Sequence, residues 1–171
     1  PQIQKTRVLF MLAIINIIMV YWAQTSYERF PIFGFNIKKT ASEKMELAIN
    51  SLRTEFKNKR INSGEDAVSF GDFLLGSENG DIVSIKGSKL SKLSTINPGF
   101  AAMISEMLIE LNISKKQKIA ISYTGSYPGA NIAVLSALEV MGYDALIISS
   151  CSASQFGATD TAFTWIDMEQ T

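Results

Sequence analysis

The chain has 171 residues, of which 47% are hydrophobic and 19% are charged, enough apolar material for one membrane segment and one compact domain. Its 16 basic and 16 acidic residues cancel, and without a long basic tract the sequence indicates no nucleic-acid partner. There is no histidine and one cysteine, Cys151, so an internal disulfide, a Ser-His-Asp triad and a His-based zinc site are all excluded from the chain's own residues.

The first predicted element is an uncharged run, VLFMLAIINIIMVYWA, over residues 8–23. It follows Lys5 and Arg7 and ends in Tyr21 and Trp22, which suit a membrane interface. As a helix it is about 24 Å long, slightly short of the hydrocarbon core. An uncleaved signal anchor, a cleaved signal peptide and a buried core helix all fit this run, and the lack of a small-x-small cleavage site favours the anchor. The preceding basic residues favour a single-pass protein of the cytoplasmic membrane, with its domain outside the cell.

The remaining residues are predicted to form a connector, a helix and a domain. We assign residues 1–27 to the anchor, 28–60 to the connector and an amphipathic helix, and 61–171 to an α/β domain. Apolar residues at helical spacing predict that helix over residues 39–59, with a stripe that packs on the domain or on a partner. Residues 62–87 are rich in Gly, Ser, Asn and Asp, and residues 81–86 within them alternate as a strand does.

The C-terminal half predicts a strand, a helix and a second strand in succession. A helix over residues 97–112 precedes them, and the strands are expected at 118–123 and 144–150, joined by a helix over 128–141 that Gly142 ends. A crossover of this length is right-handed and makes the strands parallel in a covered sheet. Because such a sheet needs helices on both faces, we expect a mostly parallel three-layer α/β domain, and expect these residues to be a truncated part of a longer protein.

Two loops follow these strands, over residues 124–131 and 149–160, and they should face one cleft at the carboxyl edge of the sheet. We expect Ser126 to cap the following helix and its first free amides to attract a carboxylate or phosphate. The predicted ligand-binding residues are Gly125, Ser126, Gly129, Asn131, Ser150, Ser152, Ser154 and Gln155. These residue types are also ordinary at helix starts, and neither a P-loop nor a full dinucleotide glycine pattern is present.

Catalytic candidates are fewer. Ser126 is a candidate nucleophile, and Asp167 and Glu169 would share one face if residues 163–169 were extended, as an acid and base pair or as metal ligands. The alternative for the two acids is a solvated strand end. Cys151 is expected to be a small buried residue at a strand end, because no histidine is present to activate it. Whether the protein is an enzyme stays open, and we predict no cofactor-binding or metal-binding residue.

Three ordered motifs, TGSYPGANIAVLSALE (124–139), ISSCSASQFGA (148–158) and FTWIDME (163–169), resemble the family of poly-gamma-glutamate system proteins. The resemblance extends upstream through residues 76–102 and includes the single N-terminal membrane segment, so it covers most of the chain. Members of the family are longer. The resemblance implies a membrane-anchored accessory component of the bacterial machinery that makes and exports poly-γ-glutamate, a capsule or secreted polymer. No defined reaction comes with it.

The resemblance carries over to particular positions. They are Gly125, Ser126, Pro128 and Asn131 in the first motif, Ser149, Ser150, Ser154 and Gly157 in the second, and Trp165, Asp167 and Glu169 in the third. Cys151 and Ser152 replace a more usual apolar-Gly pair, and Thr124 stands where Ser is common, which weighs against a strict catalytic role there.

The leading hypothesis is therefore binding of polyglutamate or a precursor at the two loops, in association with the synthase and export proteins of the membrane. One alternative is a hydrolase or transferase acting on γ-glutamyl bonds. Another is a non-catalytic scaffold for the synthase complex.

Overall fold

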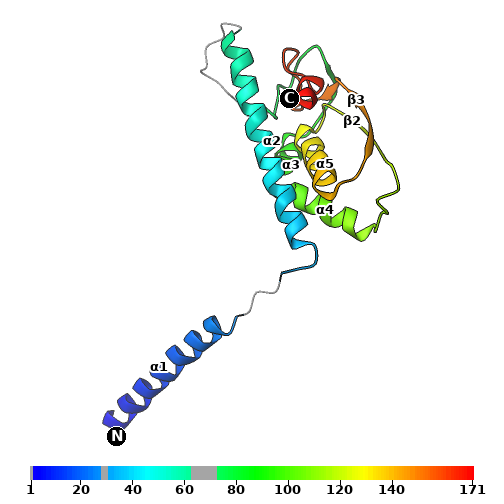
Figure 1. Ribbon diagram of the computed structural model, residues 1–171. Coiled ribbons are helices and arrows are strands. Elements are labelled where there is room, and N and C mark those ends of the chain that lie inside the picture. The colour runs from blue at the N-terminus through cyan, green and yellow to red at the C-terminus, as the bar shows by residue number, and fades with distance from the viewer. Residues whose placement is uncertain (1, 28–30, 63–72) are drawn as a thin grey trace. The chain divides into compact units, whose positions relative to one another are not determined.

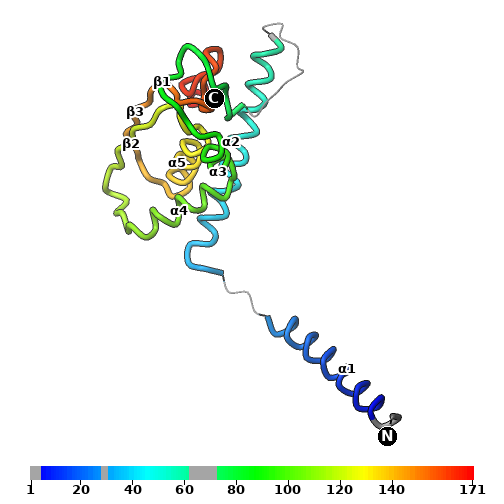
Figure 2. Tube along the Cα trace, turned by 180° about the vertical axis from the view of Figure 1, so that it is seen from behind, coloured from blue at the N-terminus to red at the C-terminus, as the bar shows by residue number. Residues whose placement is uncertain are grey.

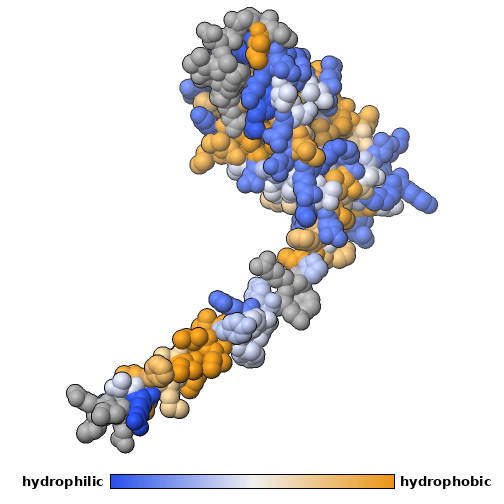
Figure 3. Space-filling view, turned by 60° about the vertical axis from the view of Figure 1, so that its left-hand side comes forward, coloured by the Kyte–Doolittle hydropathy of each residue, from blue (hydrophilic) through white to orange (hydrophobic). Residues whose placement is uncertain are grey.

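The computed structural model describes residues 2–27, 31–62 and 73–171 of the chain, in two compact units, Pro1–Phe33 and Gly34–Thr171. The first unit contains one helix, α1 (Gln2–Thr25), with a band of apolar side chains along it (Figure 3). Its segment Lys5–Thr25 is long and apolar enough to cross a membrane, although a signal sequence has the same properties. The Gly- and Asp-rich residues 63–72 lie outside the described part.

The second unit begins with a long helix, α2 (Phe35–Asn62), which confirms the predicted helix and extends it at both ends. Its buried stripe consists of Ala41, Met45, Ile49 and Leu52. Spacings of three and four residues place these side chains on one face. That face packs against α4 (Gly99–Glu110) and α5 (Pro128–Met141) (Figure 1). The predicted amphipathic helix is therefore part of the α/β unit and contributes one wall of its core.

The predicted crossover is confirmed by two parallel strands, β2 (Ile119–Thr124) and β3 (Ala145–Ser150), which pair in register over six residues. Helix α5 joins them and ends at Gly142, whose φ of 65° is the left-handed conformation that favours glycine. A second parallel pair joins β1 (Val83–Ile85) to β4 (Ala153–Ser154). The described residues of the unit thus contain two small parallel sheets among helices (Figure 2).

The β2–β3 sheet is covered on one face only by the described helices. Side chains of both strands alternate between half-buried and exposed, and Leu146 and Ile148 are each 65% exposed. Helices α2, α4 and α5 all lie to one side of the strands (Figures 1 and 2). The run of apolar residues in β3 suggested burial on both faces, but its second apolar face has no covering element in the part of the chain described.

Two short helices differ from the predictions. Helix α3 (Lys89–Thr95) was not expected, and α6 (Trp165–Gln170) replaces the extended segment predicted over residues 163–169. A capping box starts α6: the Thr164 side chain accepts from the Asp167 amide, and the Asp167 carboxylate accepts from the Thr164 amide at 2.8 Å. Reciprocal capping fixes the first helical turn, so the alternating pattern does not form a strand.

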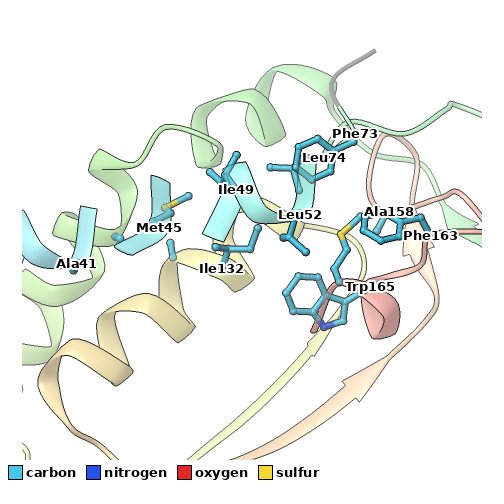
Figure 4. Packing of buried hydrophobic residues seen from close by; sticks show 13 residues of the cluster. Ala41, Met45, Ile49, Leu52, Phe73, Leu74, Ile132, Ala158, Phe163 and Trp165 are labelled. Atoms are coloured by element: carbon cyan, nitrogen blue, oxygen red, sulfur yellow. The ribbon is translucent and has the colours of Figure 1, made fainter. Parts of the chain in front are cut away.

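The core joins α2, α5 and the C-terminal segment (Figure 4). Trp165 and Phe163 are almost fully buried, and the Phe163 ring lies 5.5 Å from the ring of Phe56 on α2, tilted by 51°. Ile132 of α5 and Leu52 of α2 belong to the same cluster. Burial of large side chains contributes roughly 1.5–3 kcal/mol each. The last motif, FTWIDME, is thus a packing element that holds the C-terminal segment against α2.

Candidate functional site

The two predicted loops lie side by side and are joined by hydrogen bonds. The amide of Gly125 donates to the carbonyl of Ser152 at 2.9 Å, and the amide of Ala158 donates to the carbonyl of Gly125 at 2.7 Å. The amide of Ser154 donates to Oγ of Ser126 at 3.0 Å. We call residues 124–126 and 152–158 the loop junction. The carboxyl ends of β2 and β3 therefore meet as the crossover geometry requires.

Glycine is needed at the loop junction because two backbones approach closely there. A Cβ atom at Gly157 would lie 2.4 Å from the Gly125 carbonyl oxygen, a distance that real Cβ atoms essentially never show. A Cβ at Gly125 would meet the Cβ atoms of Ala153 and Trp165, each at 3.3 Å. Gly125 and Gly157 thus permit contact between the loops, and nothing about them requires a ligand.

Most amides of the loop junction are already used by the protein. The Ser126 amide donates to Oγ1 of Thr124 at 3.2 Å, and the Ser152 amide donates to Oγ of Ser150 at 3.3 Å. The amides of Gln155 and Gly157 donate to backbone carbonyls, each at 3.0 Å. Amide groups that are paired inside the protein are not available to an anion.

The start of α5 is arranged differently from the prediction. Its N-cap is Tyr127 and no side chain caps it, so the predicted Ser126 cap is wrong. Gly129 is buried, and a Cβ there would lie 2.7 Å from the carbonyl oxygen of Thr95. The buried Asn131 side chain donates from Nδ2 to the Thr124 carbonyl at 2.8 Å. The end of α3 therefore packs against the first turn of α5.

A buried lysine outside the predicted site residues connects α3 to the loop junction. Lys92 is 1% exposed, and its Nζ donates to Oγ of Ser154 at 2.8 Å, to the Ser154 carbonyl at 3.1 Å and to the Gln155 carbonyl. It also lies 5.2 Å from the ring centroid of Tyr127. Burial lowers the pKa of Lys92 to about 8. The segment around Lys92 is rich in serine and has no apolar pattern that marks a buried face, so the sequence does not indicate that this residue is buried.

The Ser126 hydroxyl has one remaining hydrogen-bonding capacity. Its Oγ accepts from the Ser154 amide and from the Thr124 hydroxyl, the latter at 2.8 Å. A hydroxyl has two lone pairs and one hydrogen, so these bonds leave the hydrogen to be donated. No carboxylate or amine hydrogen-bonds to this oxygen among the described residues. Ser126 therefore lacks the adjacent base that activates a serine nucleophile and is placed as a donor.

The surface beside Ser126 is neutral and rich in hydroxyl groups. Thr124 is exposed, and Ser150 and Ser152 are half-buried with their Oγ atoms 3.2 Å apart. Cys151, predicted to be buried, is exposed between β3 and β4. The chain turns between the end of β3 and the start of β4, which leaves the Cys151 side chain outside the core.

The two candidate acids do not form a pair. Burial raises the pKa of Asp167, but hydrogen bonds from Thr164 and from Lys59 outweigh this and leave that pKa below its ordinary value. Glu169 Oε1 instead accepts from the Tyr123 hydroxyl at 3.2 Å, and burial followed by the Glu169 charge raises the Tyr123 pKa. Residues two apart on a helix lie about 200° apart around its axis. Each carboxylate consequently has a separate structural partner.

Two cavities lie away from residues 124–131. One of about 520 Å³ is bordered by Arg60, Asp81 and Asp160, with Arg60 and Asp160 ion-paired. Two carboxylates and one cation do not favour a polyanion there. The other, of about 360 Å³, is lined by residues of α2, α5 and α6. Among the described residues, no three His, Cys, Asp or Glu side chains gather to hold a metal ion.

No protein-family model, no curated protein and no solved structure matches this chain.

The buried lysine predicts an unusual pH dependence of stability. The unfolded chain keeps the Lys92 proton up to its ordinary pKa of 10.5, whereas the folded protein releases it at about pH 8. Unfolding then takes up a proton between these values, so the free energy of unfolding rises with pH by at most about 1.4 kcal/mol per pH unit. Urea unfolding of the wild type and Lys92→Met from pH 7 to 10 should show this rise in the wild type only. Lys89→Met, at an exposed position on the same helix, should behave as the wild type does, and parallel curves for all three proteins would refute the assignment.

Proposed function

We propose that the chain is a membrane-anchored accessory component of poly-γ-glutamate synthesis and export that binds a carboxylate-rich ligand at the loop junction without transforming it. The resemblance of the three motifs supports the pathway, and the apolar helix α1 supports an anchored protein. The observation that carries the binding role is the Ser126 hydroxyl, whose lone pairs are both occupied and whose hydrogen has no acceptor among the described residues.

A carboxylate is the ligand that suits this donor best. Hydrogen bonds to ionised acceptors are shorter and stronger than those between neutral groups. Of the neighbouring hydroxyls, that of Thr124 already donates to Ser126, and those of Ser150 and Ser152, 3.2 Å apart, leave one further neutral donor between them. The donors are side-chain hydroxyls, since the protein itself uses most of the loop amides. The ligand in this proposal is polyglutamate or a precursor of it.

The arrangement supports binding better than catalysis. A hydrolase or transferase acting on γ-glutamyl bonds needs a base beside its nucleophile, and Ser126 has none among the described residues. Asp167 caps α6 and pairs with Lys59, while Glu169 accepts from Tyr123. A non-catalytic scaffold for the synthase complex remains the alternative that shares these observations, and loss of ligand affinity on mutation separates binding from scaffolding.

Ser126→Ala should weaken binding of γ-linked oligoglutamate by at least about 10-fold, because a hydrogen bond to a charged group contributes roughly 1.5–3 kcal/mol. The measurement is titration calorimetry on the full chain in lipid nanodiscs, with circular dichroism to verify that the variant is folded. Ser122→Ala removes an exposed hydroxyl from β2, the strand that precedes Ser126, and should leave affinity unchanged. Equal affinities of the two variants, or no affinity in the wild type, would disprove the binding role.

For α1 we propose an uncleaved anchor in the cytoplasmic membrane, with the N-terminus inside the cell and the α/β unit outside. The support is its length and composition, with Lys5 and Arg7 before the apolar run. Intact-mass analysis of the mature protein from membranes should show that residues 5–25 are retained. A mature chain that begins after residue 25 would identify the segment as a removed signal peptide.

We also propose that the second face of the β2–β3 sheet is covered in the assembled protein, giving the three-layer arrangement of a parallel sheet. The exposed Leu146 and Ile148 support this, because parallel sheets are rarely open to water. In membranes containing the complete machinery, and in a Cys151→Ser background, Ile148→Cys should react at least about 10-fold more slowly with a water-soluble maleimide than Leu47→Cys. Leu47 is similarly exposed on α2, so equal rates would mean an open face.

A further inference from the structure

Helix α4 has apolar side chains on the face that points away from the core as well as on the buried face. Ala101 and Ser105 are buried, whereas Met103, Met107 and Leu111 are 46%, 54% and 67% exposed. The exposed residues recur every four positions and therefore form one stripe along the helix and its C-cap. We call them the α4 stripe. A helix with apolar side chains on an exposed face as well as on its buried face is suited to a second contact on the exposed face.

Few charged side chains on α4 compensate for the exposure of the α4 stripe to water. Helix α4 has two ionisable residues, Glu106 and Glu110, and Glu106 is already ion-paired with Lys38 of α2. Contiguous apolar surface on a folded unit usually marks an interaction site. Methionine, which supplies two of the three residues, adapts to irregular and fluid partners.

The end of α4 lies beside the start of α2. Gly34 packs so closely on Ile109 that a Cβ there would lie 2.6 Å from its Cδ1, and the Lys38–Glu106 ion pair joins the same two helices. Phe35, at the first position of α2, is exposed as well. The α4 stripe thus belongs to the end of the unit at which the chain enters from the apolar helix.

The linker between α1 and the second unit indicates which partner the α4 stripe contacts. Residues 26–33 separate α1 from this unit, and nine peptide steps span at most about 30 Å. A bilayer that holds α1 therefore keeps the start of α2 within about 30 Å of the end of α1. Lys116 and Lys118 are exposed in the loop after α4 and are suited to anionic headgroups.

We propose that the α4 stripe docks into the interfacial region of the bilayer that holds α1, with anionic lipids preferred. The inference rests on the membrane anchoring proposed for α1. Apolar side chains buried at the headgroup boundary, together with nearby lysines, are the features by which surface helices bind membranes.

Lipid quenching tests the docking on the full chain in vesicles of phosphatidylcholine and phosphatidylglycerol with brominated acyl chains. In a Cys151→Ser background, a fluorophore is attached at Ile14→Cys in α1, at Met107→Cys in the α4 stripe, or at Leu47→Cys as an exposed control on α2. We expect strong quenching at positions 14 and 107 and at least about twofold less at 47. Omitting phosphatidylglycerol should reduce quenching at 107 only.

The outcomes separate the two proposals. Quenching at position 14 with equal values at 107 and 47 would overturn the docking and leave the anchor intact, and quenching at neither 14 nor 107 would overturn both. A label at 107 that neither brominated lipid nor aqueous iodide reaches would mean that protein, such as a second copy, covers the stripe, which also overturns the docking.

A charge substitution provides an independent readout. With the label at Met103→Cys, Leu111→Glu should lower lipid quenching at least about twofold, because a carboxylate is costly in the apolar interface. Leu90→Glu places the same charge on an exposed leucine of α3 and should have no effect. Circular dichroism confirms folding, and equal loss with both substitutions would contradict a specific role of the stripe.

Discussion

The close contact between two loop backbones is the constraint on which the second unit depends. The Gly125 amide and carbonyl are both bonded to the second loop, and the Ser126 hydroxyl receives the Ser154 amide. Since a side chain at Gly157 would collide with the Gly125 carbonyl, the motif sequences are restricted by packing before any ligand is considered. Ala158 and Trp165 at this contact belong to the hydrophobic core, so the edge of the sheet packs directly against the interior of the unit.

Hydrogen bonds from the buried Lys92 ammonium group stabilise the contact between the two loops. An ammonium group without water is costly to bury, and three oxygen acceptors from residues 154 and 155 offset that cost. Because two of these acceptors are backbone carbonyls, the lysine fixes the path of the loop and not only a side chain. Removal of the charge leaves those carbonyls without their partner, so the loop junction, α3 and the start of α5 depend on one another.

The sequence predicted the parts of the fold that are encoded locally. Pro128 and Gly142 mark both ends of α5, and the apolar runs on either side of it identify β2 and β3. For α6 the sequence contains two conflicting signals, because Thr164 and Asp167 have capping-box spacing whereas residues 163–169 alternate as a strand does. The burial of Lys92 and the exposure of one face of β3 depend on which elements pack nearby. The residue pattern within a single segment does not reveal this. The side-by-side position of the two loops was predictable because neighbouring parallel strands end at the same edge of a sheet. The internal use of their amides was not predictable, because it depends on how closely the two backbones approach.

The internal use of the loop amides limits the kind of site that the loop junction can provide. Helix-terminal amides would hold an anion through a fixed dipole, whereas hydroxyl groups make a neutral site with weaker individual bonds. A polymer that repeats its carboxylate along the chain compensates for weak single contacts, because a neighbouring group rebinds before the polymer diffuses away. In the proposed function, a hydroxyl site on an anchored unit would retain polyglutamate near the membrane without holding any one residue tightly. Such a site suits a component that accompanies a moving polymer better than one that stops it for chemistry.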